Sequence, residues 1–372
     1  MQKLSCSFFI SFCFLLSLAG QSNKGISVET NFHYGKILRH TPKLTIQIPT
    51  SSFGIESSIK FQTYGKADWQ DWQNYPQWGV SFLYYQLGSD QLGSAYGILP
   101  NLQLSIFKKK WLQLDLTIAT GLAYLSKRYD ALNNPENNAI GSSINNVTAF
   151  KASFRGRLSQ DWSWLAGGSF THFSNGASKL PNLGINIIAF NAGLNYKLNP
   201  VTKEDYRQAT ISKKPVSRFG FSLHFGLALR EMISYGGPKY PIYIGSAAGV
   251  YHFNKVNRLL VGVEYEFNQA VYRFGLHTFD FDSAATARAG ATRWMIFVAD
   301  EFMIGRIGIL LQAGIYVSKS SFLTPFPVYN KIGIRYYFPS IGKPKTNLYV
   351  GTYLKSHKID AAYIAFGMGA MF

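Results

Sequence analysis

The stretch Trp111–Tyr124, WLQLDLTIATGLAY, alternates apolar and polar side chains with a period of two. Leucine or isoleucine occupies every second position from 112 to 118, and Gln113, Asp115 and Thr117 lie between them. Successive side chains of a β-strand point to opposite faces, so this stretch predicts a strand with one apolar and one polar face.

The same alternation recurs along the chain in segments separated by Gly, Asn, Pro and Ser. In Ile307–Val317, IGILLQAGIYV, odd-numbered apolar residues oppose Gly308, Gln312 and Gly314. In Ala362–Phe372, AYIAFGMGAMF, the larger apolar residues of one face oppose Ala365, Gly367 and Gly369. We count about sixteen candidate strands, the first few of which are the weakest, and the even strand number of bacterial barrels favours sixteen or fourteen.

The composition favours a membrane β-barrel over a soluble β-sandwich. The chain has 29 Phe, 23 Tyr and 7 Trp residues among its 372, so its 59 aromatic side chains outnumber its 56 charged ones (37 basic, 19 acidic). A soluble domain carries about 25% charged residues, and aromatic residues at both ends of many strands are typical of membrane barrels. The net charge of +18 is scattered along the chain, which argues against a nucleic-acid-binding surface.

Residues 1–19 have the pattern of a secretory signal peptide. Lys3 provides the positive start, an apolar stretch follows, and Ser17-Leu18-Ala19 predicts cleavage after Ala19; the alternative is an uncleaved membrane anchor. Both cysteines, Cys6 and Cys13, lie in this segment, so the exported chain is expected to have no disulfide and no thiolate site. The histidines form no cluster with metal-ligand spacing, so we expect no metal and no other cofactor.

Two halves of the chain resemble each other weakly. The motif Tyr124-Leu125-Ser126-Lys127 is similar to Tyr316-Val317-Ser318-Lys319. Two explanations remain open: internal duplication of an eight-stranded unit, or a chance match between barrel strands. The expected divisions are residues 20–199, a polar periplasmic connection at 200–216, and residues 217–372. Of one large barrel or two small ones, we favour the single barrel, because each half alone would have to close its own sheet edge in lipid.

Candidate chemistry lies in Trp162–Asn195. Trp162, Trp164 and Phe170 mark the lipid-facing side of a strand, and His172 and Ser174 follow on the same side. Residues 175–184 form a turn-rich hairpin connection, after which the next strand directs Asn191 and Asn195 to the interior. Counting strands from a periplasmic N-terminus places this hairpin at the cell exterior.

At these residues the chain resembles the outer-membrane lipid A 3-O-deacylases. The resemblance rests on His172-Phe173-Ser174-Asn175-Gly176 and Pro181-Asn182-Leu183-Gly184-Ile185 and covers about residues 110–199; two further stretches, Gly121–Leu125 and Asn137–Ser142, suggest the longer members labelled acyloxyacyl hydrolases. It implies a serine esterase that removes an ester-linked acyl chain from lipid A of lipopolysaccharide. Ser174 would then be the nucleophile and His172 its general base, while Asn175 and Asn182 would position the site or stabilise the oxyanion.

One position departs from the family pattern. Where the family carries a glutamate that completes the triad, this chain has Asn186. Replacing the triad acid of a serine protease by its amide lowers turnover by about 10⁴. Three hypotheses remain open: a hydrolase that uses Asn186 as a weak orienting group, a hydrolase that borrows Asp130 or Glu136, and a catalytically degenerate barrel with a structural or channel role. We favour the carboxylic ester hydrolase.

The second half contains no His-x-Ser and reads Leu354-Lys355-Ser356-His357 at the corresponding strand end, so we expect it to be catalytically silent. The expected location is the bacterial outer membrane, with the site near the external leaflet. Lys127, Arg128 and Lys179 are candidates to bind lipid A phosphates. A final strand ending on Phe372 resembles the assembly signal of outer-membrane proteins, which predicts the barrel assembly machinery as a partner.

Overall fold

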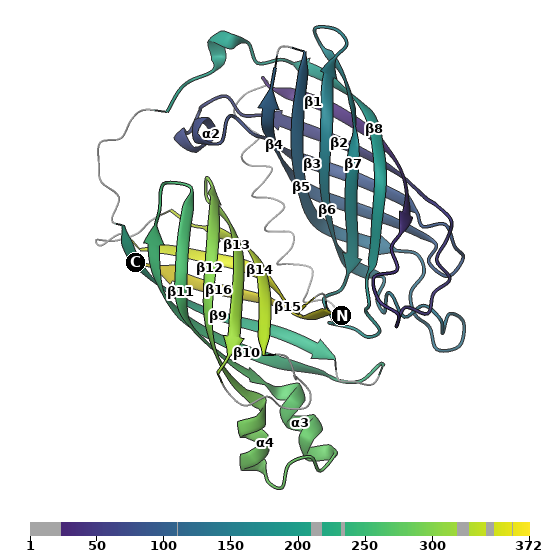
Figure 1. Cartoon of the computed structure of the whole chain (residues 1–372), viewed down its shortest axis with the longest axis vertical. Helices are drawn as coiled ribbons and strands as arrows, with labels where there is room; N and C mark the ends of the chain where they lie inside the picture. The colour runs from purple at the N-terminus through teal and green to yellow at the C-terminus, as the bar shows by residue number, and fades with distance from the viewer. Residues whose placement is uncertain are drawn as a thin grey trace.

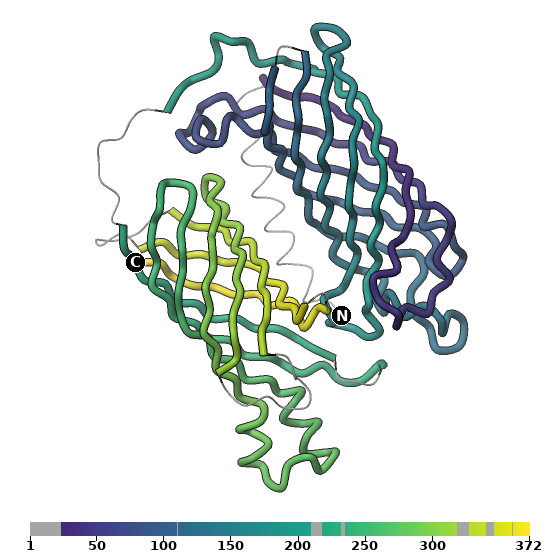
Figure 2. The backbone as a smooth tube through the Cα atoms, in the orientation of Figure 1, coloured from purple at the N-terminus to yellow at the C-terminus, as the bar shows by residue number. Residues whose placement is uncertain are grey.

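The computed structural model describes residues 24–109, 111–209, 218–231, 235–317, 327–339, 346–358 and 360–372. In this part of the chain the strands form two closed antiparallel barrels of eight strands each. Figure 1 shows them as the purple-to-teal and the green-to-yellow sheets, and the tube in Figure 2 follows the same path. The expected signal peptide lies outside the described residues, as does part of the connection between the barrels.

The first barrel contains the strands that carry the candidate site. They are β1 (Ile26–Ile37), β2 (Ser52–Gln62), β3 (Gln77–Gln86), β4 (Ser94–Lys108), β5 (Leu112–Leu125), β6 (Ile144–Arg157), β7 (Trp162–Ser174) and β8 (Ile185–Asn199). The short helix α2 (Asp68–Trp72) lies between β2 and β3, and the 3₁₀ turn η1 (Lys203–Asp205) follows β8.

The second barrel repeats this up-and-down order. Its strands are β9 (Phe219–Glu231), β10 (Lys239–His252), β11 (Asn257–Asn268), β12 (Thr292–Ile304), β13 (Ile307–Tyr316), β14 (Val328–Tyr337), β15 (Asn347–His357) and β16 (Asp360–Met371). Two helices, α3 (Gln269–His277) and α4 (Ala284–Ala291), project from one end between β11 and β12 (Figure 1). None of the helices in the described ranges has the length and apolarity needed to cross a membrane.

The expectation of a membrane barrel fold with sixteen or fourteen strands is confirmed, with sixteen strands in the described residues, but the preference for one large barrel is wrong. β1 pairs with β8 along its whole length, with Tyr34 opposite Phe190, and β9 pairs with β16, with Phe225 opposite Met368. Each half therefore satisfies its own edge strands, so no edge remains to be joined to the other half. Eight strands also enclose an interior narrow enough for side chains to fill.

Both barrels have apolar outer walls and charged interiors. The alternating residues of β5 and β13 follow the expected faces, and Trp162, Trp164 and Phe190 are exposed on the outer wall. Inside the first barrel, Lys60 Nζ lies 2.7 Å from Glu29 Oε1, and the guanidinium of Arg155 bridges Glu29 and Asp115 at 2.9 and 2.7 Å; Lys151 pairs with Glu56.

The second barrel encloses its own network of charged side chains. Lys355 Nζ lies 2.6 Å from Glu266, Lys331 pairs with Glu264, and Arg335 lies 3.5 Å from Glu301. Because ionised groups are costly in lipid and find partners only inside, these networks fix which face of each strand points inward.

Removal of Glu29 is expected to destabilise the first barrel. Glu29→Ala leaves Lys60 buried without its carboxylate partner, and losing one member of a buried ion pair costs about 3 kcal/mol or more. Urea unfolding of the refolded protein in lipid vesicles measures this loss. Ser57→Ala, a change on the outer side of the adjacent strand, is the control and should shift the unfolding free energy by less than about 0.5 kcal/mol. Equal shifts for the two variants would contradict the prediction.

Candidate active site

The candidate site lies where β7 ends and β8 begins, at the hairpin formed by residues 175–184. His172 pairs with Asn186 across the two strands. His172 and Asn186 share the outer face with the exposed Trp162, Trp164 and Ile188, so the expectation that His172 faces outward is confirmed. The site thus lies on the outside of the barrel wall.

The imidazole of His172 is held by Asn186. His172 Nδ1 lies 2.6 Å from Asn186 Oδ1, and an amide oxygen only accepts, so the proton of the imidazole belongs on Nδ1 in this arrangement. Gly184 lies against the ring: a Cβ built at this residue would lie 2.9 Å from His172 Cε1, and its φ of +82° favours glycine. The ring is therefore fixed in orientation, and its Nε2 remains available as a proton acceptor.

Ser174 is covered by the hairpin rather than exposed to lipid. Its side chain is buried, with the whole residue only 6% exposed, which corrects the expectation of an open lipid-facing position for this residue. The Ser174 Oγ accepts hydrogen bonds from Asn182 Nδ2 at 2.9 Å and from the backbone N–H of Gly176 at 3.1 Å. In the described residues no hydrogen bond links this hydroxyl to His172, and such contacts are often long in the absence of substrate.

Asn175 and Asn182 have different surroundings. Asn182 contacts the serine hydroxyl, and its Oδ1 accepts the backbone N–H of Asn175 at 2.9 Å. The Asn175 side chain donates to Ser142 Oγ and to the Lys179 carbonyl, both at 2.8 Å. Asn175 therefore fastens the hairpin to the β5–β6 loop, whereas Asn182 is placed to act at the serine.

Neither acid suggested as a substitute for the missing glutamate reaches His172. Asp130 Oδ1 accepts the backbone N–H groups of Leu132 and Asn133 in its own loop. Glu136 accepts a hydrogen bond from Gln91 at 2.5 Å. In the part of the chain that the structure describes, Asn186 is the residue hydrogen-bonded to Nδ1 of the imidazole, which argues against the hypothesis of a borrowed acid from this loop.

The residues at the corresponding strand end of the second barrel do not form a comparable pair. His357 points inward, where its Nε2 lies 2.7 Å from the hydroxyl of Tyr316, while Ser356 lies on the opposite face of β15. Among the described residues, no group of three His, Cys, Asp or Glu side chains is arranged to hold a metal ion.

Two protein-family models match this chain, one over most of each barrel. A model of lipid A 3-O-deacylase (PagL) matches residues 54–195, which include the whole hairpin. A model of the C-terminal domain of acyloxyacyl hydrolase matches residues 219–372, and between them the two models match well over half of the chain. The chain belongs to the lipid A 3-O-deacylase (PagL) family. It is therefore a hydrolase of lipid A acyl esters and an outer-membrane protein.

Solved structures of outer-membrane barrels are similar to this PagL-family protein only in a general way. Neisserial surface protein A is 12% identical, covers 48% of this chain and 100% of its own, and superposes with a TM-score of 0.35. A BenF-like porin from Pseudomonas fluorescens Pf-5 is 9% identical, and the match covers 94% of this chain and 98% of the porin, with a TM-score of 0.24. Comparison with curated proteins finds no match.

Sequence reasoning missed several residues around the PagL-type hairpin. The backbone N–H of Gly176 and the side chain of Ser142 contact the site, and Glu231 and Ile364 of the second barrel approach the same hairpin. The glycine after Ser174-Asn175 offered a signal, because a residue with φ of +60° at a hairpin start favours glycine. Contacts from the second barrel carry no local signal in the sequence.

Proposed function

We propose that this protein is an outer-membrane serine esterase that removes an ester-linked acyl chain from lipid A, with Ser174 as nucleophile. The observation that carries the proposal is the His172–Asn186 pair, 2.6 Å apart and two residues along the strand from a serine held by Asn182 and Gly176. This arrangement lies within the segment that matches lipid A 3-O-deacylase.

The geometry suggests how the residues share the reaction. His172 donates its Nδ1–H to Asn186, so Nε2 can accept the proton of Ser174 as Oγ attacks the ester carbonyl. Asn182 Nδ2 and the Gly176 N–H, which donate to Oγ in the free protein, are placed to donate to the developing oxyanion. The protonated imidazole then delivers its proton to the sugar oxygen, which leaves as an alcohol. Water, deprotonated by the same imidazole, releases the fatty acid from the serine.

The loops support an orientation with the site at the external leaflet. At the end that carries the site, the connections 38–51, 126–143 and 175–184 are long. At the opposite end two turns, 109–111 and 158–161, are short, and the connection 63–76 carries α2. Outer-membrane barrels have short periplasmic turns and longer external loops. Lys127 and Arg128 are exposed in the β5–β6 loop and Lys179 lies in the hairpin, so all three lie at the end where lipid A phosphates would lie.

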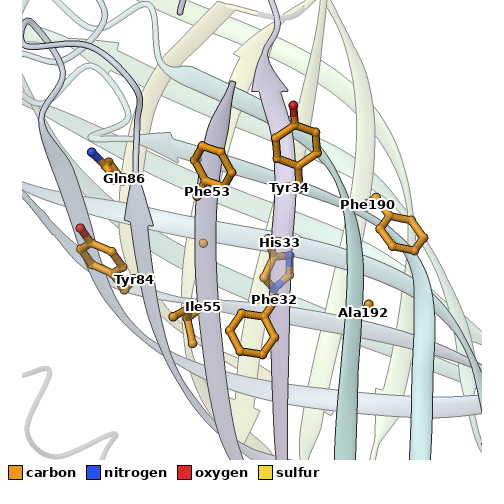
Figure 3. Close-up of a pocket in the computed structure, with 10 residues that line it drawn as sticks. Phe32, His33, Tyr34, Phe53, Ile55, Tyr84, Gln86, Phe190 and Ala192 are labelled. Atoms are coloured by element: carbon orange, nitrogen blue, oxygen red, sulfur yellow. The ribbon is translucent and has the colours of Figure 1, made fainter. Parts of the chain in front are cut away.

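An apolar groove on the same outer wall offers room for an acyl chain. It has a volume of about 320 Å³ and is lined by residues of β1, β2, β3 and β8. Figure 3 shows the rings of Tyr34, Phe53 and Phe190 on neighbouring strands around it. The ring centroids of Tyr34 and Phe53 lie 5.2 Å apart. Phe190 lies four residues from Asn186 on β8, so an acyl chain leaving the site along the barrel wall would reach this groove.

The interior of the first barrel argues against a channel. Lys60, Lys151, Glu29 and Glu56 are buried within it, and their ion pairs cross the interior. An eight-stranded barrel filled by side chains leaves no continuous water path. Because the chain folds as membrane β-barrels, we expect the barrel assembly machinery to insert it into the outer membrane.

The experiment that tests the proposed function is incubation of the refolded, full-length protein with purified lipid A, followed by mass spectrometry. The expected product has lost one hydroxyacyl chain, which is recovered as a free fatty acid. Unchanged lipid A, at protein concentrations where the barrels are shown to be folded by gel mobility with and without heating, would contradict the proposal.

Replacing Asn182 should slow the reaction. Asn182→Ala removes the donor to Ser174 Oγ and the acceptor of the Asn175 N–H, and loss of one oxyanion donor lowers turnover by about 10². The rate of fatty acid release from lipid A measures the change. Asn133→Ala, in the β5–β6 loop, is the matched control and should retain the wild-type rate. Full activity of Asn182→Ala would exclude it from the site.

A further inference from the structure

One outward-facing position of the second barrel is buried, and a second one nearby is half-buried. On β9, Leu229 is 43% exposed on the outer wall, but Glu231, two residues further on the same face, is only 4% exposed. On β16, Phe366 is 46% exposed, whereas Ile364, two residues away on the same face, is half-buried. β9 and β16 pair with each other, so Glu231 and Ile364 lie along one seam of the outer wall. Something other than lipid covers this seam at one end.

The cover is the hairpin that carries the candidate site of the first barrel. The backbone N–H of Leu180 donates to the carboxylate of Glu231. A Cβ built on Gly176 would clash with Cγ1 of Ile364, so the Ile364 side chain lies directly against the glycine backbone. Beside these contacts, the rings of Tyr129 and Tyr235 meet edge to face with centroids 5.0 Å apart. Each contact joins an outer loop of the first barrel to the second barrel.

We propose that the second barrel positions the catalytic hairpin of the first, with Glu231 and Ile364 as the positioning residues. The inference rests on the proposed function and assigns a role to the half that has no His-x-Ser. Glu231 fixes the hairpin at Leu180, between Asn175 and Asn182, and Ile364 covers Gly176, whose N–H donates to Ser174 Oγ.

The chemistry of these contacts explains why they suit positioning. A carboxylate on the outer wall of a barrel is costly in lipid, and a hydrogen bond from a backbone N–H to a charged group is among the stronger ones. Catalytic groups must be held within about 0.5 Å of their productive positions, and a loop meets this requirement only when other elements support it. Neither residue touches the proposed reacting atoms, so both act through the hairpin.

Kinetics of the full-length protein on lipid A test the role of Glu231. Glu231→Ala should lower kcat about tenfold and leave KM within about twofold, because the hairpin loses its anchor while the acyl groove and basic loops remain. Glu231→Gln retains an acceptor for the Leu180 N–H and should recover most of the rate. Asp282→Ala, an exposed acid in the α3–α4 loop of the same barrel, is the control and should match wild type.

Ile364→Ala tests the second contact in the same assay, with a severalfold decrease in kcat expected. Ile332→Ala is its control, since Ile332 is an exposed outer-wall residue of β14. Unchanged kcat in both Glu231→Ala and Ile364→Ala would overturn the proposal. An equal loss in Glu231→Ala and Glu231→Gln would also overturn the assigned role of the N–H contact.

Cross-linking tests the contact without any activity measurement. The double variant Tyr129→Cys/Tyr235→Cys should be cross-linked in high yield by a short bis-maleimide, which changes its gel mobility. The matched pair at Tyr129 and Phe279, an exposed residue beyond α3, should not react together. Efficient cross-linking with no lipid A hydrolysis by wild type would reject the proposed function and leave the interface intact; no cross-linking would reject the interface.

Discussion

Ser174→Ala is expected to lower lipid A deacylation by at least about 10³, the largest loss of any single change. The substitution removes Oγ, which is the proposed point of covalent attachment of the acyl chain and the acceptor for Asn182 and Gly176. Loss of the nucleophile in a serine hydrolase leaves only the contribution of substrate binding and oxyanion stabilisation. Release of fatty acid from lipid A, followed by mass spectrometry, measures the residual rate.

The control for this variant is another serine in the same hairpin. Ser178→Ala changes a half-buried residue four positions away and should retain activity within about twofold. Ser174→Ala adds no bulk, but it leaves Asn182 Nδ2 and the Gly176 N–H without their acceptor, so gel mobility with and without heating checks that the variant is folded. Deacylation that persists unchanged in Ser174→Ala would show that the nucleophile lies elsewhere, whatever the activity of the control.

Much of the fold follows from alternation in the sequence. The period of two predicted the outer and inner faces of β5, β7 and β13. A shift of one residue would turn the polar side chains toward lipid and the apolar ones toward the charged interior, which is too costly. The number of barrels did not follow, since alternation describes faces and not the partner of an edge strand. Pairing of β1 with β8 depends on strand tilt and stagger, which no local pattern encodes.

The candidate site was predictable as far as it lies on adjacent strands. The resemblance to the family identified His172 by its motif and Asn186 by the position of the missing glutamate, and the hairpin of β7 and β8 places the two residues opposite each other. The burial of Ser174 was not predictable, since strand parity places it on the outer wall and only the folded hairpin covers it. Contacts made by Glu231 and Ile364 depend on the packing of two barrels, which have separate hydrogen-bonded sheets.

Asn186→Glu is expected to raise kcat for lipid A deacylation by about 10³. Asn186 already accepts from His172 Nδ1 at 2.6 Å, so the wild-type amide orients the ring, but it provides no negative charge to stabilise the imidazolium that forms when Ser174 is deprotonated. A glutamate carboxylate supplies that charge. It also only accepts hydrogen bonds, whereas the amide of asparagine can flip and present its NH₂ group to the imidazole. The position tolerates a longer side chain because Asn186 is on the outer face and only half buried.

The dependence of this gain on His172 separates a restored triad from an unrelated stabilisation. In a His172→Gln background, Asn186→Glu should give no increase, because the carboxylate then has no imidazolium to stabilise. Double-mutant analysis of kcat therefore measures a coupling of about three powers of ten, which is about 4 kcal/mol. An increase of similar size in both backgrounds would show that the gain does not act through His172 and is no restored triad. No increase in either background would show that the amide at 186 does not limit turnover, and that the limit lies in another step such as release of the fatty acid along the barrel wall.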